Sequence, residues 1–201
     1  MAPKPNQKIA IIAIAAIVLV LGITATFVII EAQNSRSDLP VLGVVPDFKL
    51  TASTGLDFGS KEMKGNICVV DFFFTSCEGP CPIMADQMST LYKALAGSGK
   101  IQFISISVDP DRDRLQVLQE YARRQNVTDD RWVFLRGDKT EIKWLSEDVF
   151  KLAADDLPAT HSTKFVLVDD QGQIRGYYSG TDQTSINILK THIRELAQNL
   201  K

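Results

Sequence analysis

A long uncharged stretch near the N-terminus constrains this chain more than any other feature. Residues 9–30 carry no charged side chain, and most of them are apolar. As a helix rising about 1.5 Å per residue, the stretch reaches roughly 33 Å, enough for the ~30 Å hydrocarbon layer of a bilayer. We therefore predict a membrane-spanning helix over residues 9–30, preceded by a cytoplasmic N-terminus over residues 1–8.

The charges that flank this stretch predict its orientation. Lys4 and Lys8 precede it, whereas Glu31 and Arg36 follow it. The positive-inside rule then keeps the N-terminus in the cytoplasm and exports everything that follows. We expect a single-pass protein of the cytoplasmic (inner) membrane, with its C-terminal domain on the periplasmic, extracytoplasmic side. A cleaved signal peptide is the alternative, but its apolar core usually spans only about 7–15 residues.

The charge balance and the N-terminal sequence bear on two questions: whether the protein binds nucleic acid, and in which compartment it works. The chain has 22 Lys and Arg residues against 24 Asp and Glu residues, without a long run of either sign. Nucleic-acid binding needs a basic stripe that displaces counterions from phosphates, so we expect no nucleic-acid partner. The chain also lacks an Arg- and Ser-rich presequence, which favours a bacterial envelope over a mitochondrion.

Strands and helices alternate after a short tether that we place at residues 31–46. Patterns of apolar residues predict strands at 47–52, 56–58, 67–74, 101–108, 132–135, 163–169 and 174–178. They predict helices at 82–95, 113–125, 140–152 and 184–200. A βαβαβ unit followed by a ββα unit is an α/β plan with a thioredoxin-like fold, in which helices flank a central mixed sheet. We assign residues 47–201 to this domain.

Two cysteines lie where the central predicted strand passes into a helix. Cys77 and Cys81 are four residues apart, so on a helical turn their Cβ atoms are about 5–6 Å apart. That spacing allows a disulfide, and it also lets two thiolates bind one soft ion such as Cu(I). A helix N-terminus is expected to lower thiol pKa values. A disulfide that only staples the loop is the alternative, but such junctions are where α/β folds place their sites.

Other residues near the pair have both a chemical and a structural interpretation. Asp71 could accept a proton from the thiols or could be a hydrogen-bonded polar residue at the sheet end, and the sequence leaves this open. Asp109 could line the site, but ending its strand is the safer role. Cys68, Met84 and Met88 are interpreted as core residues from their strand and helix positions.

Several segments, taken in order, resemble one family. These are Val70–Cys77, Cys81-Pro82, Ser107–Pro110, Trp132–Gly137 and Thr160–Thr163. Together they are similar to the Sco/SenC copper chaperones, thioredoxin-like proteins that assemble the binuclear copper site of cytochrome c oxidase. The resemblance covers residues 40–200 and the single anchor helix.

The resemblance implies a ligand set, a cargo and a partner. The implied copper ligands are Cys77, Cys81 and His161, holding Cu(I) or Cu(II). The implied partner is the copper-accepting subunit of a membrane oxidase, to which the protein delivers copper or whose thiols it prepares. An imidazole nitrogen would join two sulfurs in a set that copper accepts, although His161 could also be a surface or capping residue. His192, on the last predicted helix, is interpreted as a solvated residue.

Two enzyme classes compete with a metallochaperone. A thiol–disulfide oxidoreductase could use the same Cys77/Cys81 pair. Such enzymes normally have two residues between the cysteines, where this chain has three. They also have a proline just before the later strand, close to the position that His161 occupies here. A peroxiredoxin would need a proline and a Thr or Ser where this chain has Val70 and Phe74. We expect a metallochaperone rather than an enzyme, although thiol–disulfide exchange stays open.

Overall fold

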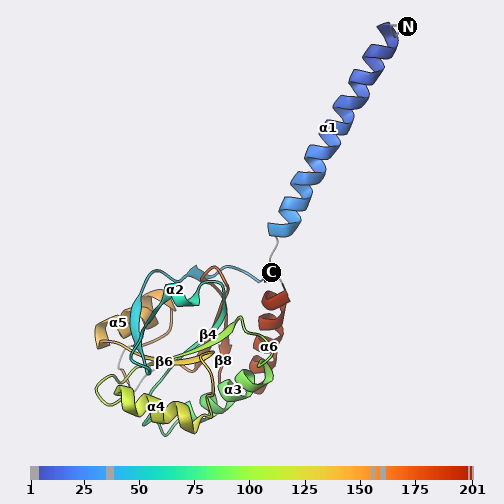
Figure 1. Cartoon of the computed structure of the whole chain (residues 1–201). Helices are drawn as coiled ribbons and strands as arrows, with labels where there is room; N and C mark the ends of the chain where they lie inside the picture. The colour runs from blue at the N-terminus through green and yellow to red at the C-terminus, as the bar shows by residue number, and fades with distance from the viewer. Residues whose placement is uncertain (1–4, 35–38, 155–156, 159–161, 199, 201) are drawn as a thin grey trace. The chain divides into compact units, whose positions relative to one another are not determined.

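The computed structural model describes residues 5–34, 39–154, 157–158, 162–198 and 200 (Figure 1). The chain divides into two compact units, Met1–Asp38 and Leu39–Lys201. The segment 39–46, predicted as part of the tether, is included in the second unit.

The first unit contains a single described helix, α1 (Pro5–Asn34). Its described side chains, Ile9 and residues 12–26, are exposed. Among the described residues, no helix is both long enough and apolar enough to cross a membrane. The structure therefore does not confirm the membrane span that the sequence predicts over residues 9–30.

The described residues of the second unit form an eight-stranded sheet with the strand order β1-β8-β7-β4-β5-β6-β2-β3. The strands are β1 (Gly43–Val44), β2 (Lys49–Ala52), β3 (Asp57–Gly59), β4 (Ile67–Phe73), β5 (Ile101–Ser107), β6 (Trp132–Arg136), β7 (Lys164–Val168) and β8 (Gln173–Ser179). β4, β5 and β6 are parallel, while β7 pairs antiparallel with both β4 and β8. The sheet is therefore mixed, with its parallel part at the centre.

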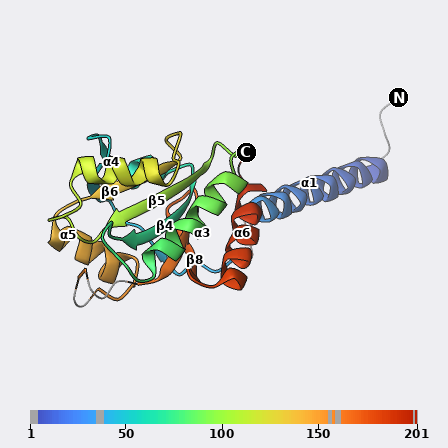
Figure 2. The ribbon, with the colours of Figure 1, turned by 90° about the horizontal axis from the view of Figure 1, so that it is seen from below.

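Helices cover both faces of this sheet (Figure 2). They are α2 (Ser60–Met63), α3 (Cys81–Ala94), α4 (Leu115–Arg124), α5 (Lys139–Trp144), which continues as a π-helical turn over Leu145–Val149, and α6 (Gln183–Gln198). Right-handed crossovers between β4, β5 and β6 place α3 and α4 on the same face. α6 joins them there, whereas α2, α5 and the π-helical turn contribute to the opposite face.

Strand β4 separates two hydrophobic cores because its side chains alternate between the faces. Ile67, Val69 and Phe73 pack under α3, α4 and α6. Cys68, Val70 and Phe72 pack on the opposite face, under α5. Asp71 lies between Val69 and Phe73 in the alternation, so its side chain is on the face that carries α3. All seven residues of β4 are buried, which explains why the strand reads as a nearly continuous apolar run.

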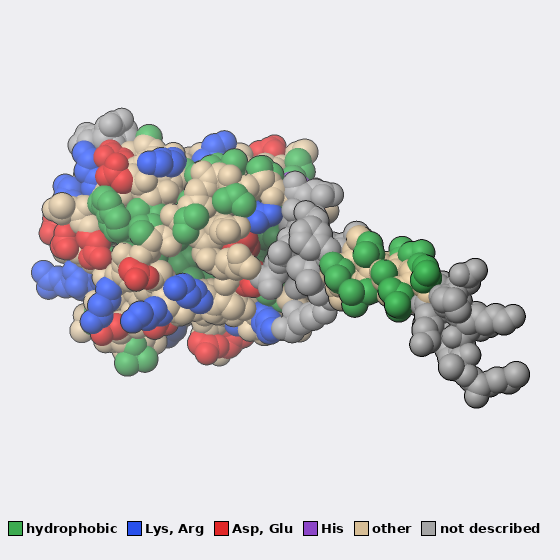
Figure 3. All heavy atoms as spheres, turned by 90° about the horizontal axis from the view of Figure 1, so that it is seen from above, with side chains coloured by type: hydrophobic (Ala, Val, Ile, Leu, Met, Phe, Trp, Pro, Cys, Tyr) green, Lys and Arg blue, Asp and Glu red, His purple; other side chains and the backbone are tan. Residues whose placement is uncertain are grey.

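The predicted α/β plan is confirmed by this order of elements. β4-α3-β5-α4-β6 is the βαβαβ unit, and β7-β8-α6 is the ββα unit. The helix predicted over 140–152 instead ends at Trp144 and passes into a π-helical turn. Lys151 then has a positive φ of 52°, which is incompatible with continuing a right-handed helix. On the surface, basic and acidic side chains are interspersed over the face of the domain drawn in Figure 3.

Candidate metal centre

The candidate site lies in the loop between β4 and α3. β4 ends at Phe73, and α3 begins at Cys81 with Pro80 as its cap residue. The Met84 amide donates to the Pro80 carbonyl at 3.0 Å, which closes the first helical turn. Pro82 fits in this turn because its missing amide would have no helical partner there. The predicted strand-to-helix junction is therefore present.

The two thiols of the site lie together but differ in exposure. Cys81 is 2% exposed and belongs to the core under α3, whereas Cys77 is half-buried. Their side chains are hydrogen-bonded to each other. A Cβ atom built at Gly79 would be 4.0 Å from Cys77 Sγ, so the sulfur lies back over the loop. Neither cysteine is in a disulfide bond, and Cys77 gives the pair its contact with solvent.

The expected effect of the helix N-terminus on thiol acidity is wrong for Cys81. Burial raises the pKa of the Cys81 thiol, and its hydrogen bond with Cys77 raises the pKa further. A backbone hydrogen bond from Phe74 acts in the opposite direction. Desolvation of the thiolate by the core therefore outweighs the favourable end of α3.

Asp71 is a buried acid beneath the thiol pair. Burial raises its pKa to about 7, while a hydrogen bond with Ser105, its partner in the β4–β5 register, lowers the pKa. Trp132 Nε1 donates to Ser105 Oγ at 3.0 Å. Among the described residues, Asp71 Oδ1 has no hydrogen-bond partner. Its charge raises the pKa of Cys81, so Asp71 is electrostatically coupled to the site.

The sequence analysis missed two residues that border the site. Tyr121, on α4, packs its ring on Phe73 with centroids 5.1 Å apart. Burial raises the pKa of the Tyr121 phenol, and the charges of Asp71 and Cys81 raise it further. Its position three residues after the buried Leu118 was the available signal. Asp113, the second missed residue, hydrogen-bonds to Thr75 at the start of the loop.

The residues given structural interpretations are found in the predicted environments. Cys68, Met84 and Met88 are buried: Cys68 lies in the core opposite Asp71, and the methionines lie on the core-facing side of α3. Asp109 follows β5, and its carbonyl accepts from the Asp113 amide at 2.8 Å. Its carboxylate forms an ion pair with Arg112 at 3.7 Å. The Asp109 backbone therefore shapes the turn that follows the strand.

His161, the third implied ligand, lies outside the described residues. The segment directly after it is described: the Gly180 amide donates to the Thr163 carbonyl at 2.8 Å. A Cβ at Gly180 would be 3.0 Å from Met84 Cγ, on the first turn of α3. Within the described part of the chain, no group of three His, Cys, Asp or Glu side chains could hold a metal ion. The three-ligand set thus stays a prediction.

His192 differs from its interpretation as a solvated residue. It is half-buried on α6, and Tyr178 Oη is 2.7 Å from its Nδ1. The two rings also meet edge to face, with centroids 5.7 Å apart. The aromatic partner lies on β8, outside the helix that carries His192, so the helical pattern alone did not predict this contact.

The fold of the second unit has counterparts among known proteins. A sequence comparison matches the family SCO1/SenC over residues 39–198. The chain belongs to the SCO1/SenC family. Its match to the family covers the whole described sheet and all the helices of the second unit, so family membership and fold rest on the same residues.

Three solved structures are similar to this SCO1/SenC chain. A SCO1/SenC family lipoprotein from Bacillus anthracis has 31% identity and a TM-score of 0.73, covering 79% of this chain and 97% of that one. BsSco, a Sco-family cytochrome c oxidase assembly protein with a disulfide switch, has 28% identity and a TM-score of 0.71, with coverages of 80% and 97%. ScoI of Bradyrhizobium japonicum, solved with copper bound, shares the fold at 24% identity and a TM-score of 0.62, with coverages of 74% and 99%.

Proposed function

We propose that this protein binds one copper ion through Cys77, Cys81 and His161 and passes it to the copper-accepting subunit of a membrane oxidase. The observation that carries the proposal is the pairing of the Cys77 and Cys81 thiols at the start of α3. Thiolates are soft ligands that suit Cu(I), and a third ligand from imidazole is compatible with both copper oxidation states. The family comparison and the copper-bound ScoI of the same fold support this cargo.

The contrast between the two thiols suits a site that must load and unload. Cys81 is fixed in the core, whereas Cys77 is partly exposed in the middle of the loop. An incoming ligand from a partner can therefore reach the metal from the side of Cys77. Copper must displace the thiol protons, and the raised pKa of Cys81 makes that displacement harder at low pH. Asp71, with a pKa of about 7, supplies a nearby acceptor.

His161 is proposed as the third ligand from its place in the chain. Thr163, two residues later, is held by Gly180, which packs against Met84 on the first turn of α3. The chain therefore passes close to the helix that begins at Cys81. A neutral imidazole is a common copper ligand.

We also propose that residues 9–30 anchor the protein in the cytoplasmic membrane with the domain outside. The uncharged stretch has the length for a span, and Lys4 and Lys8 mark its cytoplasmic side. The B. anthracis relative is described as a lipoprotein, so membrane attachment also occurs within the family.

The second candidate function is thiol–disulfide exchange with the recipient's cysteines. The observation that favours it is that Cys77 and Cys81 are adjacent and not joined by a disulfide, and that one of them is accessible. BsSco is described with a disulfide switch. Such exchange needs only the two cysteines, so it does not depend on His161.

A copper titration of residues 39–201 distinguishes these functions. This fragment contains both hydrophobic cores, so it keeps everything that holds the domain together. We expect about one Cu(I) per chain, lost in Cys77→Ser and Cys81→Ser and bound at least about 10-fold more weakly in His161→Ala. His192→Ala is the matched control, since His192 contacts Tyr178 on α6. Unchanged affinity in His161→Ala, together with rapid insulin reduction by the unmodified chain, would favour the oxidoreductase instead.

A further inference from the structure

A fully buried carboxylate, Asp113, joins the loop after β5 to the loop that carries Cys77. Its side chain is 0% exposed. Thr75 Oγ1 donates to Asp113 Oδ1 at 2.5 Å, and the Thr75 amide donates to Oδ2 at 3.1 Å. Ser107 Oγ donates to the same Oδ2 at 2.5 Å. One carboxylate therefore accepts three hydrogen bonds from two separate segments.

The position of Asp113 in the sequence suggests another role. Aspartate just before a helix usually caps the helix by accepting from its first amides. In α4 the cap residue is Arg114, and its side chain makes no cap hydrogen bond. The described hydrogen bonds of the Asp113 carboxylate lead instead to the end of β5 and to the loop after β4. The acid thus serves a contact 38 residues away in sequence.

Asp113 anchors the thiol loop at Thr75. Hydrogen bonds to a charged acceptor are about twice as strong as neutral ones, and two of them end on Thr75, two residues before Cys77. The Cys77 amide donates only at 3.3 Å, to the Phe74 carbonyl. Ser76, Glu78 and Gly79 are exposed. The two bonds to Asp113 therefore fix the backbone at Thr75, where the loop begins.

We propose that Asp113 is a positioning residue for the Cys77/Cys81 copper site. By fixing both the amide and the hydroxyl of Thr75, it holds Cys77 Sγ within reach of Cys81, which α3 holds independently. The ligands are then pre-organised, and copper binding does not have to order the loop. This inference rests on the proposed copper function, and it assigns to Asp113 no contact with the metal.

The test measures copper affinity in the full chain, purified in a mild detergent. Asp113→Asn keeps the side-chain shape but loses the charge and one acceptor oxygen. We expect its Kd for Cu(I) to rise about 10–100-fold, the range typical of groups that orient metal ligands. The thiolate-to-Cu(II) charge-transfer absorption should also shift. Asp111→Asn is the matched control, because Asp111 is exposed in the same turn; it should bind copper like the unmodified chain.

Thr75 variants test the same contact from the other side and keep Asp113 intact. Thr75→Val loses the hydroxyl donor, and we expect it to weaken copper binding in the same direction as Asp113→Asn. Thr75→Ser keeps the hydroxyl donor and should bind copper with the affinity of the unmodified chain. In the Thr75→Val/Asp113→Asn double variant the two losses should not add, since both remove one contact. If Asp113→Asn does not fold, the comparison of Thr75→Val with Thr75→Ser decides.

The outcomes separate this inference from the copper function itself. The Tm of each copper-free variant shows whether Asp113 serves only the stability of the fold. A lowered Tm with unchanged Kd and unchanged absorption in Asp113→Asn would overturn the proposal, as would equal affinities for Thr75→Val and Thr75→Ser. If the unmodified chain binds no copper, the copper function fails and this inference fails with it. If the unmodified chain binds copper but Asp113→Asn and Thr75→Val bind it equally well, only the proposed role of Asp113 fails.

Discussion

Asp71 shows how one buried side chain makes the domain sensitive to pH. An acid with a folded pKa of about 7 and an ordinary value of 3.8 binds a proton more readily in the folded state than in the unfolded state. Raising the pH from about 4 to 7 therefore removes a proton that favours folding, and stability falls through that window. Above about pH 7 the penalty is constant, because Asp71 is ionised in both states.

We therefore predict that Asp71→Asn stabilises the copper-free domain at pH 8 by roughly 1–4 kcal/mol and has little effect at pH 4. Asparagine has the same shape and can keep the hydrogen bond with Ser105, but it carries no charge to desolvate. Denaturant unfolding of residues 39–201 at pH 4, 6 and 8 measures the difference. Asp130→Asn, at an exposed position, is the control and should show no such trend. A stabilisation that is equal at all three pH values would contradict the assignment.

The sequence predicted the arrangement of site residues only where they are close together in the chain. The Cys77 and Cys81 spacing predicts neighbouring thiols, and the structure has them. The acidity of Cys81 was predicted wrongly because its burial depends on α3 packing against distant strands. Asp113 was overlooked because its partner Thr75 is far away in sequence.

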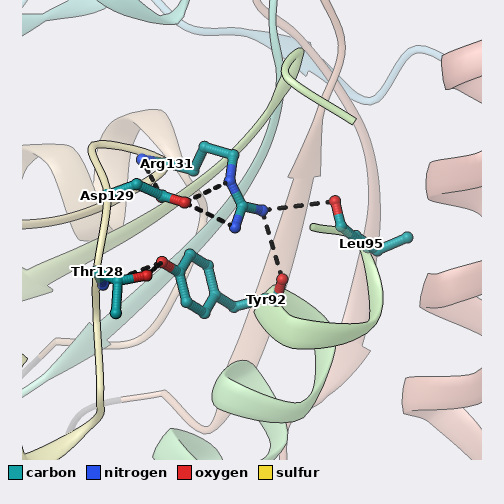
Figure 4. Close-up of polar contacts among 5 residues, drawn as sticks. All are labelled: Tyr92, Leu95, Thr128, Asp129 and Arg131. Carbon is teal, nitrogen blue, oxygen red and sulfur yellow. Dashed lines mark hydrogen bonds and ion pairs between the residues drawn. The ribbon is translucent and has the colours of Figure 1, made fainter. Parts of the chain in front are cut away.

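At the scale of elements, α3 carries Cys81 at its start and is fastened at its end by Arg131 (Figure 4). Arg131 Nη1 donates to the carbonyls of Tyr92 and Leu95, each at 3.4 Å, where the helix leaves its last carbonyls without helical partners. The guanidinium also lies over the Tyr92 ring, 4.4 Å from its centroid. Asp129 holds it through two hydrogen bonds, at 3.1 and 3.0 Å.

We predict that Arg131→Met destabilises the domain by about 1–3 kcal/mol, since the last carbonyls of α3 and the Asp129 carboxylate lose a charged partner. Arg131→Lys should recover only part of this, because an ammonium cannot reach all these acceptors in one plane. Denaturant unfolding measures the loss, with Arg123→Met at an exposed position of α4 as the control. Copper affinity of the folded protein should be unchanged, because the contact is at the opposite end of α3 from Cys81. Equal stability of Arg131→Met and Arg123→Met would show that the end of α3 needs no such contact.

The elements themselves were predictable because each carries a local periodic pattern. The nearly continuous apolar run of β4 and the spaced apolar residues of α3 and α6 predicted those elements to within two residues of their observed ends. β1 has two residues and pairs with β8, which leaves too short a pattern to recognise. The pairing of β2 with β6 is long-range, so the sequence predicted the strands β2 and β3 but not their place in the sheet.

At the scale of the whole chain, function depends on the compartment in which the domain folds. A thiol pair that binds copper must be kept reduced, and outside the cytoplasm adjacent thiols tend to be oxidised unless a metal or a reductant prevents it. The proposed orientation, with residues 9–30 as an anchor, therefore also implies a reductant or prompt copper loading in that compartment. An inward domain would need neither.

A pair of reporters fused after Lys201 tests this orientation. A reporter that works only when exported should be active, because Lys4 and Lys8 hold the N-terminus on the cytoplasmic side. A reporter that works only in the cytoplasm should be inactive at the same position. Removing residues 1–38 is the control and should reverse both signals, since the domain then lacks its export segment. The reverse pattern in the unmodified chain would place the thiols inside the cell and remove the need for their protection from oxidation.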